Sequence, residues 1–451
     1  MRIRTRSVAG LACIVVLAAA CTAGNSNTSP SSTPTVNVSG SHEPVTLTMW
    51  SGFEKPEIDY LGSVVSDFEN QYPWIHVKMV PGKQDTDVLT AIRGGTAPDV
   101  AMLTVPDDAV QFCSTGLYVD MGPYMRADNI DLNSLVPEGA LAYTANAVKG
   151  KPCMLPLLND AYGLYYNTDM FERAGIAHPP KTYSELFADA KKLTQYNPDG
   201  SIKVAGFLPL ATGDYEFANY VNGIYSGANW YDQSGKCLLA SDPRFAQQLR
   251  FLKSMVDFFG YDKLSRFFSS NGGENSEFSP SNLFEHQKLA MDFDGEWRVA
   301  FIRNDKSDVP YASAPAPVAD DHPDLYGVGQ TGGSTLGIPR GTQHPGEAWL
   351  LIKYLTLDKQ AVVKFARQIR NVPTLISALD DPVLTQDPHF NTFMKIVANP
   401  NSRYKQITKL GFGDTSLYDA FVDKYLAGKV PLESGLQQLA KQIDDQLKLG
   451  A

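Results

Sequence analysis

The sequence lacks the residue patterns on which metal binding and nucleic-acid binding depend. Its five cysteines include no C-x-x-C pair, and its seven histidines are scattered without the spacing of metal ligands. The net charge is −10 and no cluster of Lys and Arg interrupts it, whereas a nucleic-acid surface has to be basic. We therefore expect no metal ion, no cofactor and no nucleic-acid partner.

One acidic stretch resembles a calcium-binding loop at its start only. Asp292 and Asp294, with the glycine that follows, mimic the beginning of a D-x-D-G motif. The motif needs further oxygen ligands downstream, and Trp297 and Val299 are not ligands. We therefore reject a calcium site here.

The motifs of common hydrolases and nucleotide-binding enzymes are also missing. The chain has no G-x-S-x-G, no H-E-x-x-H and no Walker loop. Two carboxylates beside a sugar could make a glycosidase, and Glu54, Asp160 and Asp294 are candidates for such a pair. Nothing in the sequence places two of them at a working separation. We therefore predict that the protein is not an enzyme, with an extracellular glycosidase as the alternative from another functional class.

Long apolar runs are absent except at the N-terminus. Three arginines within the first six residues precede an apolar run over residues 11–20. This run has the length of a signal peptide and is too short to span a bilayer. We predict that residues 1–20 are a signal peptide and that the protein is extracytoplasmic.

Small residues directly before Cys21 resemble the lipobox of bacterial lipoproteins, in which the cysteine is lipidated and becomes the N-terminus. Leu17 lies four residues before Cys21, whereas the pattern usually has leucine three before it. An ordinary signal-peptide cleavage after Ala20 also fits. Residues 21–42 are rich in Ser, Thr, Asn, Pro and Gly and nearly uncharged, so we expect a disordered tether. This predicts a domain anchored to the outer face of the cell membrane by Cys21.

The remainder has the composition of a globular protein, with 43% hydrophobic and 20% charged residues. Apolar residues alternate with polar ones over 45–49 and 75–79, and 99–103 is a buried strand. Helical spacing separates these strands, which predicts an α/β fold with a parallel sheet. Ligands of such sheets bind beyond the carboxyl ends of the strands, where Trp50, Ser51, Glu54 and Asp107 stand.

The stretch 150–175 contains a long extended run in the middle of the sequence pattern. It begins as a turn, becomes an extended run rich in Leu and Tyr, and ends in a short amphipathic piece closed by Gly175. The polar pair Asn159 and Asp160 interrupts the extended run. This pattern predicts a strand that crosses between two bodies, with the ligand in the cleft beside it.

Several motifs in order resemble one known family, the substrate-binding lipoproteins of bacterial ABC importers, in the branch that carries oligosaccharides and glycerol phosphates. The resemblance covers about residues 45–445. Its carriers are Leu47-Thr48-Met49-Trp50-Ser51-Gly52, Phe68-Glu69-x-x-Tyr72-Pro73, Gly94-Gly95-Thr96-Ala97-Pro98-Asp99-Val100, the stretch 150–175, Leu283-Phe284-Glu285, Gly295-Glu296-Trp297, Gly332-Gly333-Ser334 with Ile338-Pro339, and Asn371-Val372-Pro373-Thr374.

The resemblance implies a two-lobed fold of the type II periplasmic-binding-protein class, with parallel-sheet lobes that close on ligand by hinge motion. The first lobe would hold 45–158 and 334–388, and the second 162–328 and 389–451. Cys113 and Cys153 would both lie in the first lobe and are the predicted disulfide, which leaves Cys237 as a buried thiol.

Carbohydrate recognition needs flat apolar surfaces for the C–H faces of a sugar and hydrogen-bonding groups for its hydroxyls. Trp50, Trp230 and Trp297 stand at strand or loop ends and are the predicted stacking residues, with packing in a core as the alternative. Trp74 and Trp349 are predicted to be core residues.

Most of the predicted hydrogen-bonding groups follow from the resemblance. It places ligand contacts on the crossing stretch and on the glycine-rich strand, although these could instead be a solvated turn and a plain bend. The full predicted set is Ser51, Glu54, Asp107, Asn159, Asp160, Tyr162, Asp294, Gly333, Ser334 and Arg370. Arg370 and Arg403 could each clamp an anion or a diol, or form a surface ion pair.

The function that the resemblance implies is capture of a di- or oligosaccharide and its delivery to ABC permease subunits in the membrane. The alternative ligand is glycerol 3-phosphate or a glycerophosphodiester, which would need Arg370 or Arg403 in the cleft. We expect a monomer.

Overall fold

The computed structural model describes residues 42–144, 151–210, 220–276, 279 and 281–449. All of these residues belong to one compact unit, residues 35–451. The predicted signal peptide, Cys21 and nearly all of the predicted tether lie outside the described residues. Within the described ranges, no helix combines the length and the apolar character needed to cross a membrane.

A five-stranded sheet in the order β2-β1-β3-β11-β4 is the centre of what we call the first lobe. Its strands are β1 (Val45–Trp50), β2 (Ile75–Val80), β3 (Val100–Leu103), β4 (Met154–Pro156) and β11 (Thr335–Gly337). β1 pairs in parallel with β2 and β3, as predicted. β11 is antiparallel to β3 and β4, so a strand from late in the chain completes this sheet.

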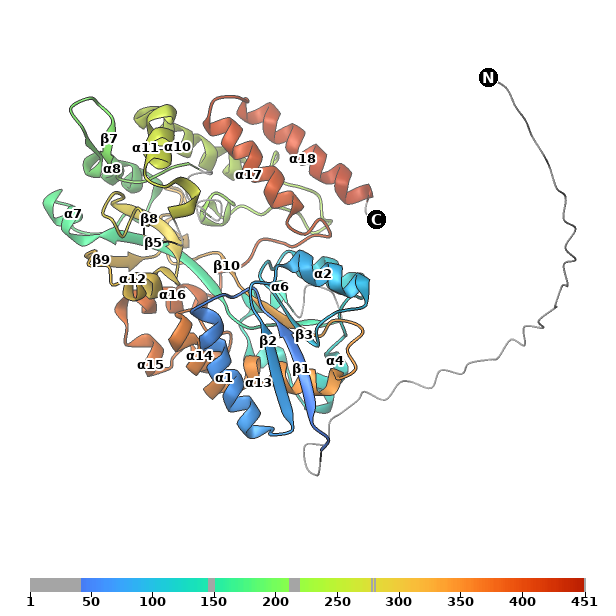
Figure 1. Cartoon of the computed structure of the whole chain (residues 1–451). Helices are drawn as coiled ribbons and strands as arrows, with labels where there is room; N and C mark the ends of the chain where they lie inside the picture. Colours follow the sequence, from blue (N-terminus) through green and yellow to red (C-terminus); the bar gives the residue numbers. More distant parts are fainter. Residues whose placement is uncertain (1–41, 145–150, 211–219, 277–278, 280, 450–451) are drawn as a thin grey trace, which may run out of the picture. The chain divides into compact units, whose positions relative to one another are not determined.

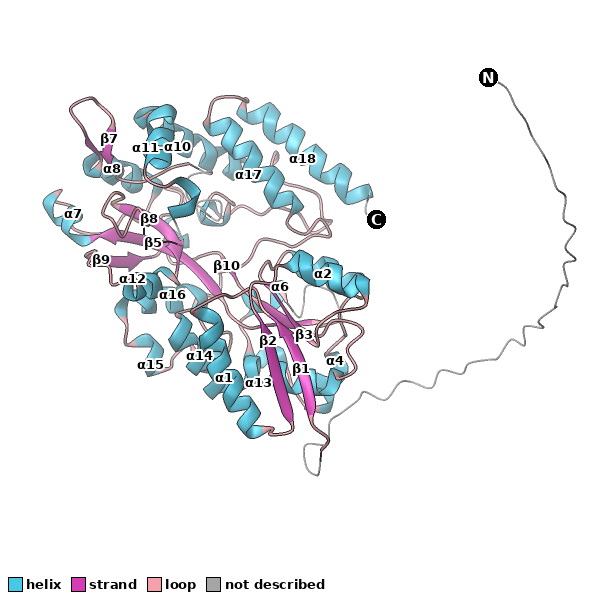
Figure 2. Ribbon diagram, in the orientation of Figure 1, coloured by secondary structure: helices cyan, strands magenta, loops and turns pink. Residues whose placement is uncertain are grey.

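Helices cover the first sheet because each has an apolar face. α1 turns Leu61, Val65 and Phe68 into the core at helical spacing, and α1 and α2 lie beside β2 and β3 (Figure 2). The helices of this lobe are α1 (Glu57–Gln71), α2 (Asp85–Gly94), α3 (Asp108–Ser114), α4 (Gly122–Ala127), α5 (Leu132–Leu135), α6 (Glu138–Tyr143), α13 (Pro345–Leu357) and α14 (Lys359–Ile369). Trp349 on α13 is 4% exposed and Trp74 packs on the same core, so both are core residues as predicted.

A second sheet is the centre of what we call the second lobe. Its strands are β5 (Asp160–Asn167), β8 (Met291–Gly295), β9 (Tyr311–Ala314) and β10 (Thr331–Gly332), with a separate hairpin of β6 (Gln195–Tyr196) and β7 (Ile202–Val204). β5 pairs with β8, β9 and β10, always antiparallel. We expected parallel sheets in both lobes, and for the second sheet this prediction is wrong. The long connections before β8, β9 and β10 bring each of these strands alongside β5 in the opposite direction.

The second lobe is otherwise helical. Its helices are α7 (Thr168–Arg173), α8 (Tyr183–Leu193), α10 (Pro243–Phe259), α11 (Tyr261–Ser270), α12 (Arg298–Asn304), α15 (Pro382–Thr385), α16 (Pro388–Ala398), α17 (Gly413–Leu426) and α18 (Leu432–Leu449), with single-turn 3-10 helices at Ile224–Ser226, Gly273–Ser276 and Pro323–Leu325. A further 3-10 helix, Ile376–Ala378, packs against α14 and the core of the first lobe. One core cluster draws on residues 47–158 and 336–378 and another on residues 162–443. The lobe boundaries stay a prediction.

The crossing segments lie side by side. β5 and β10 pair through Asp160 and Gly332, and the N–H of Asn159 donates to the carbonyl of Val372 at 3.0 Å. Gly333 has φ +128°, and a Cβ there would lie 2.2 Å from the carbonyl oxygen of Leu158. Only glycine fits this position, because it lets the two crossings approach each other. Figure 1 shows β5 and β10 between the first sheet and the helices of the second lobe.

The cysteines pair as the resemblance implied. Cys113 at the end of α3 is bonded to Cys153 just before β4, with their Cα atoms 5.9 Å apart. Cys237 is free and buried in the second lobe. The disulfide therefore ties two segments of the first lobe together.

Candidate functional site

Polar groups gather where the segments cross. Asn159 is 1% exposed, and its side-chain oxygen lies 3.3 Å from the hydroxyl of Tyr143, which also donates to the carbonyl of Gly332 at 2.5 Å. The amide Nδ2 of Asn159 is buried and has no hydrogen-bond partner in the protein. A buried donor without an acceptor costs free energy, so an oxygen atom brought to this amide would remove that cost.

Two carboxyl groups lie beside this amide. Asp160 is partly exposed and accepts a hydrogen bond from the amide of Asn371 at 2.8 Å. Glu296 is 0% exposed and accepts one from the N–H of Ala161 at 2.8 Å. Burial raises the pKa of Asp160 to about 6. Burial and the charge of Asp160 raise the pKa of Glu296 well above its ordinary value.

An aromatic pair stands next to these carboxyl groups. The rings of Tyr162 and Trp297 meet edge to face, with centroids 5.6 Å apart and an interplanar angle of 89°. Tyr162 also stacks on Phe293, and Trp297 is partly exposed where α12 begins. Residue 295 lies opposite Tyr162 in the strand register, and a Cβ there would come within 2.4 Å of the indole. Glycine at 295 is therefore what lets the indole lie against the strand.

The carboxyl end of β1 holds three predicted residues in different environments. Trp50 is partly exposed and its ring lies 4.7 Å from the ammonium of Lys83. Ser51 is 0% exposed and its hydroxyl accepts from the N–H of Phe53 at 3.2 Å, so it shapes the turn. Glu54 is exposed. Of the three, the structure leaves Trp50 and Glu54 accessible.

Asp107 and Trp230 are buried instead of facing solvent. Asp107 is 0% exposed, and its two oxygens accept hydrogen bonds from Lys405 and Tyr404. Trp230 is 2% exposed, belongs to the second core, and donates its indole N–H to the carbonyl of Asn222 at 2.7 Å. Trp230 is therefore a core residue, which was the alternative interpretation, and the hydrogen bonds to Asp107 hold its carboxylate in a buried position.

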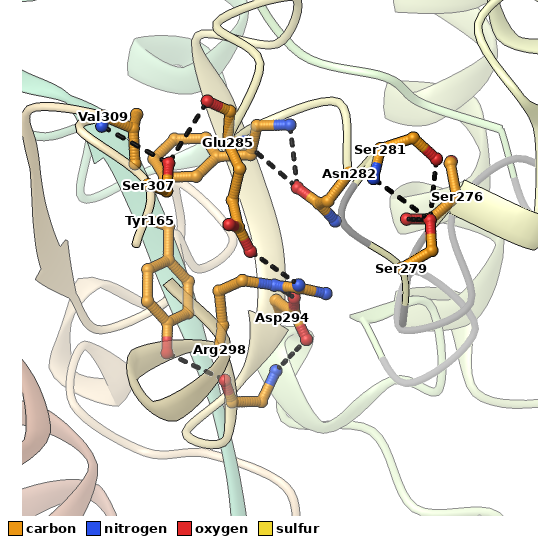
Figure 3. Close-up of polar contacts among 12 residues, drawn as sticks. Tyr165, Ser276, Ser279, Ser281, Asn282, Glu285, Asp294, Arg298, Ser307 and Val309 are labelled. Carbon is orange, nitrogen blue, oxygen red and sulfur yellow. Dashed lines mark hydrogen bonds and ion pairs between the residues drawn. The ribbon is translucent and has the colours of Figure 1, made fainter. Parts of the chain in front are cut away.

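Asp294 is held in a buried ion cluster (Figure 3). Its oxygens accept from the guanidinium of Arg298 at 2.5 Å and from the N–H of Gly295 at 2.7 Å. Arg298 also donates to Glu285 at 3.1 Å, and these side chains are at most 3% exposed. Asp294 is therefore buried and fixes the turn that carries Trp297, and its predicted ligand contact stays a prediction.

The two candidate arginines are both engaged by the protein. Arg370 ends α14 with φ +63°, lies 3.7 Å from the carboxylate of Asp387 and faces a cavity of about 290 Å³ together with Arg303. Arg403 donates to the carbonyl of Ala228 at 3.2 Å. Burial lowers the pKa of both arginines. The Nε and Nη1 of Arg370 are buried without a hydrogen-bond partner, so part of this guanidinium is free to bind an anion. The cavity that it faces is lined by residues of α12 and by Asp387, and not by the residues of the crossing segments.

Ser334 and Gly333 use their backbones inside the protein. The carbonyl of Ser334 accepts from the N–H of Leu157 at 2.8 Å, and the Ser334 side chain is partly exposed. Two further hollows, of about 870 and 910 Å³, lie beside α14 and beside β7 and α11, and none of the predicted residues lines them. Across the described ranges no group of three or more His, Cys, Asp or Glu is placed to hold a metal ion.

Sequence reasoning missed five residues of this region: Tyr143, Glu296, Asn371, Tyr404 and Lys405. Glu296 and Asn371 stood within motifs that carried the resemblance, so a signal for them was present. Tyr404 and Lys405 carried no local signal, because their partner Asp107 lies about 300 residues earlier in the chain.

Comparison with known proteins identifies relatives of the chain. The family model described as bacterial extracellular solute-binding protein matches residues 55–362. The multiple sugar-binding protein of Streptococcus mutans is 23% identical over 75% of this chain and 81% of its own length. The maltotriose-binding protein of Pyrococcus abyssi is 20% identical over 76% and 69%. A probable ABC transporter-binding protein of Deinococcus radiodurans is 25% identical over 61% of this chain and 64%, under two thirds, of its own.

Solved structures share the fold. CpMnBP1 with mannotriose bound has a TM-score of 0.76 at 23% identity, covering 88% of this chain and 99% of that one. Maltose-bound MalE3 of T. maritima has a TM-score of 0.71 at 24% identity, covering 89% and 100%. The chain therefore has the predicted two-lobed α/β fold of periplasmic binding proteins.

Proposed function

Because the chain belongs to the bacterial extracellular solute-binding proteins, we propose that it is the substrate-binding component of an ABC importer and captures a di- or oligosaccharide between its lobes. The observation that carries this proposal is the crossing region. It combines the Tyr162–Trp297 pair with the carboxyl group of Asp160 and the unpaired amide of Asn159.

These groups match the two surfaces of a sugar. The partly exposed indole of Trp297 supplies a flat apolar face for sugar C–H groups. Asp160 has one oxygen on Asn371, and its other oxygen can accept from a sugar hydroxyl. The amide of Asn159 donates to a hydroxyl oxygen. Relatives whose names state maltotriose or multiple sugars as their ligands support the same class.

We propose binding without catalysis. Asp160 and Glu296 are two neighbouring carboxyl groups, the feature that a glycosidase needs. Glu296 accepts a hydrogen bond from the backbone N–H of Ala161, so we assign it to holding the crossing strand β5 and not to acid–base chemistry. Ligand instead lowers the free energy of the closed arrangement of the lobes relative to the open one, and the permease recognises the closed form.

A glycerol phosphate ligand has less support. It would need a cationic fork facing the crossing region, whereas Arg370 faces the cavity beside α12 and Asp387, and Arg403 donates to the carbonyl of Ala228. We retain it as an outcome of the test.

We also propose that residues 1–20 are removed as a signal peptide, that Cys21 is lipidated, and that residues 21–42 tether a monomeric domain to the cell membrane. The family's extracellular character and the arginines before the apolar run support this. Metabolic labelling with a fatty acid should mark the wild-type chain and not Cys21→Ser. Equal labelling of both would contradict lipidation at Cys21.

Thermal unfolding with a ligand panel tests the proposed function. Maltotriose, mannotriose and maltose stand for saccharides, and glycerol 3-phosphate stands for the alternative. A ligand at 100 times its dissociation constant adds about 2.7 kcal/mol of stability, so a saccharide should raise Tm clearly. A rise with glycerol 3-phosphate alone would overturn the saccharide proposal.

A further inference from the structure

A second buried ion cluster lies at the contact between the lobes. The ammonium of Lys405 is 2.5 Å from a carboxylate oxygen of Asp107 and 3.0 Å from one of Asp414. The Lys405 side chain is 4% exposed and both aspartate side chains are 0% exposed. One positive charge is therefore shared by two carboxylates away from water.

The two carboxylates belong to different lobes. Asp107 stands between β3 and α3, at the carboxyl end of the first sheet. Asp414 lies in the first turn of α17, which packs against α10, and accepts from the hydroxyl of Tyr231 at 2.5 Å. Tyr231 is part of the second core. Lys405 is therefore a link from one lobe to the other.

The segment that carries Lys405, residues 402–408, touches both lobes as well. Tyr404 packs on the first core and donates its hydroxyl to Asp107 at 2.6 Å. The ammonium of Lys405 lies 5.3 Å from the ring of Trp230 in the second core. The carbonyl of Arg403 accepts from Thr331 on the crossing strand β10. Lys405 is thus held at the contact from both sides.

The energetics of such a cluster depend on whether its members stay together. Burial raises the pKa of Asp107, and the two carboxylates keep the pKa of Lys405 above its ordinary value despite burial. Removing one member of a buried ion pair leaves an uncompensated charge, which is strongly unfavourable. Moving Asp107 away from Lys405 therefore requires that water reach both groups, as it does when lobes separate.

We propose that Lys405 is a positioning residue for ligand binding, whose ammonium bridges Asp107 and Asp414 and thereby sets the fraction of ligand-free protein with its lobes together. This rests on the proposed function, because apparent affinity scales with the fraction of protein in the binding-competent arrangement. Asp107 then acts through the bridge and not by touching the sugar.

The chain supplies its own matched control. Arg298 is likewise a buried cation bonded to two carboxylates, Glu285 and Asp294, with the charge of Asp292 also acting on it, and this whole cluster lies in the second lobe (Figure 3). Glu285→Gln and Asp107→Asn make the same change: each neutralises one carboxylate and leaves the cation its other partner. Only Asp107→Asn alters a contact between lobes.

The test measures the distance between spin labels placed at Lys78 in the first lobe and Lys263 in the second, both exposed. Without ligand, Asp107→Asn and Lys405→Met should shift the distance distribution, and Glu285→Gln should leave it as in the wild type while lowering Tm. Maltotriose, used as the probe, should bind about tenfold more weakly to Asp107→Asn and Lys405→Met than to the wild type.

The proposal is overturned if Asp107→Asn lowers Tm as Glu285→Gln does and keeps the wild-type distance distribution. If Lys405→Met does not fold, the distance distribution of Asp107→Asn decides the test, because in that variant Lys405 keeps its ion pair with Asp414. Failure of the wild type to bind any saccharide would refute the proposed function. The spin-label distances measured without ligand would still test whether Lys405 holds the lobes together.

Discussion

The indole of Trp297 lies so close to the backbone of Gly295 that a Cβ at residue 295 would be 2.4 Å from the ring. The same glycine stands opposite Tyr162 in the pairing of β5 with β8. Trp297 stands two residues after Gly295. This spacing therefore sets both the edge-to-face contact of Tyr162 with Trp297 and the direction in which the exposed part of the indole points.

Gly295→Ala should displace the indole. Because the added methyl group would overlap the ring, Trp297 has to turn away, and saccharide affinity should fall at least about tenfold, or about 1.4 kcal/mol. Near-ultraviolet circular dichroism should change along with affinity. Gly62→Ala on α1 is the control, since a Cβ there meets its nearest atom at 3.9 Å. Unchanged affinity in Gly295→Ala would contradict a role for the indole's orientation.

The pH dependence of stability should reveal Asp160. Its pKa is raised from 3.8 to about 6 by burial, so the folded protein binds more protons at this group than the unfolded chain does between those values. Stability therefore falls as pH rises through this window. Asp160→Asn should raise Tm more at pH 7 than at pH 4, measured by calorimetric scans. An equal change at both values would mean that burial does not raise this pKa.

Removing the disulfide should lower the free energy of unfolding without changing saccharide affinity. Cys113 and Cys153 are 40 residues apart, and closing a loop of that length constrains the unfolded chain by about 4 kcal/mol. The double variant Cys113→Ala/Cys153→Ala should lose about that much in denaturant unfolding and keep its saccharide affinity at low temperature. Loss of affinity with an intact fold would show that the disulfide shapes the site.

Trp230 and Trp297 should respond in opposite ways to replacement. Trp230 is 2% exposed in the second core, so Trp230→Ala should lower the free energy of unfolding by about 3–5 kcal/mol. Trp297 is partly exposed, so Trp297→Ala should cost far less. Denaturant titrations of both variants check this. Equal losses would contradict the assignment of Trp230 to the core and Trp297 to the site.

Much of the fold could be predicted because its signals are local. Alternating residues in β1 and β2 and the apolar face of α1 are each complete within a few residues. The direction of the strands that pair with β5 had no local signal in the sequence, because β8 and β9 lie more than 120 residues further along the chain. Sequence patterns therefore predicted the elements better than their pairing.

The site shows the same division. Asn159, Asp160 and Tyr162 were predicted on a continuous stretch, and of these Tyr162 contacts Trp297. The predicted role of Asp107 did not account for Lys405, a partner about 300 residues away that takes up one of its oxygens. Such long-range ion pairs leave no pattern in the sequence near either residue.

Calorimetric titration of the wild type and Trp297→Ala with maltotriose and mannotriose tests the central claim most directly. We expect saturable heat with one saccharide bound per wild-type chain, and none for Trp297→Ala at the same concentrations, while far-ultraviolet circular dichroism and Tm show that the variant is folded. Equal binding by both proteins would remove Trp297 from the site. Hydrolysis of the saccharide without saturable binding would contradict the solute-binding function itself.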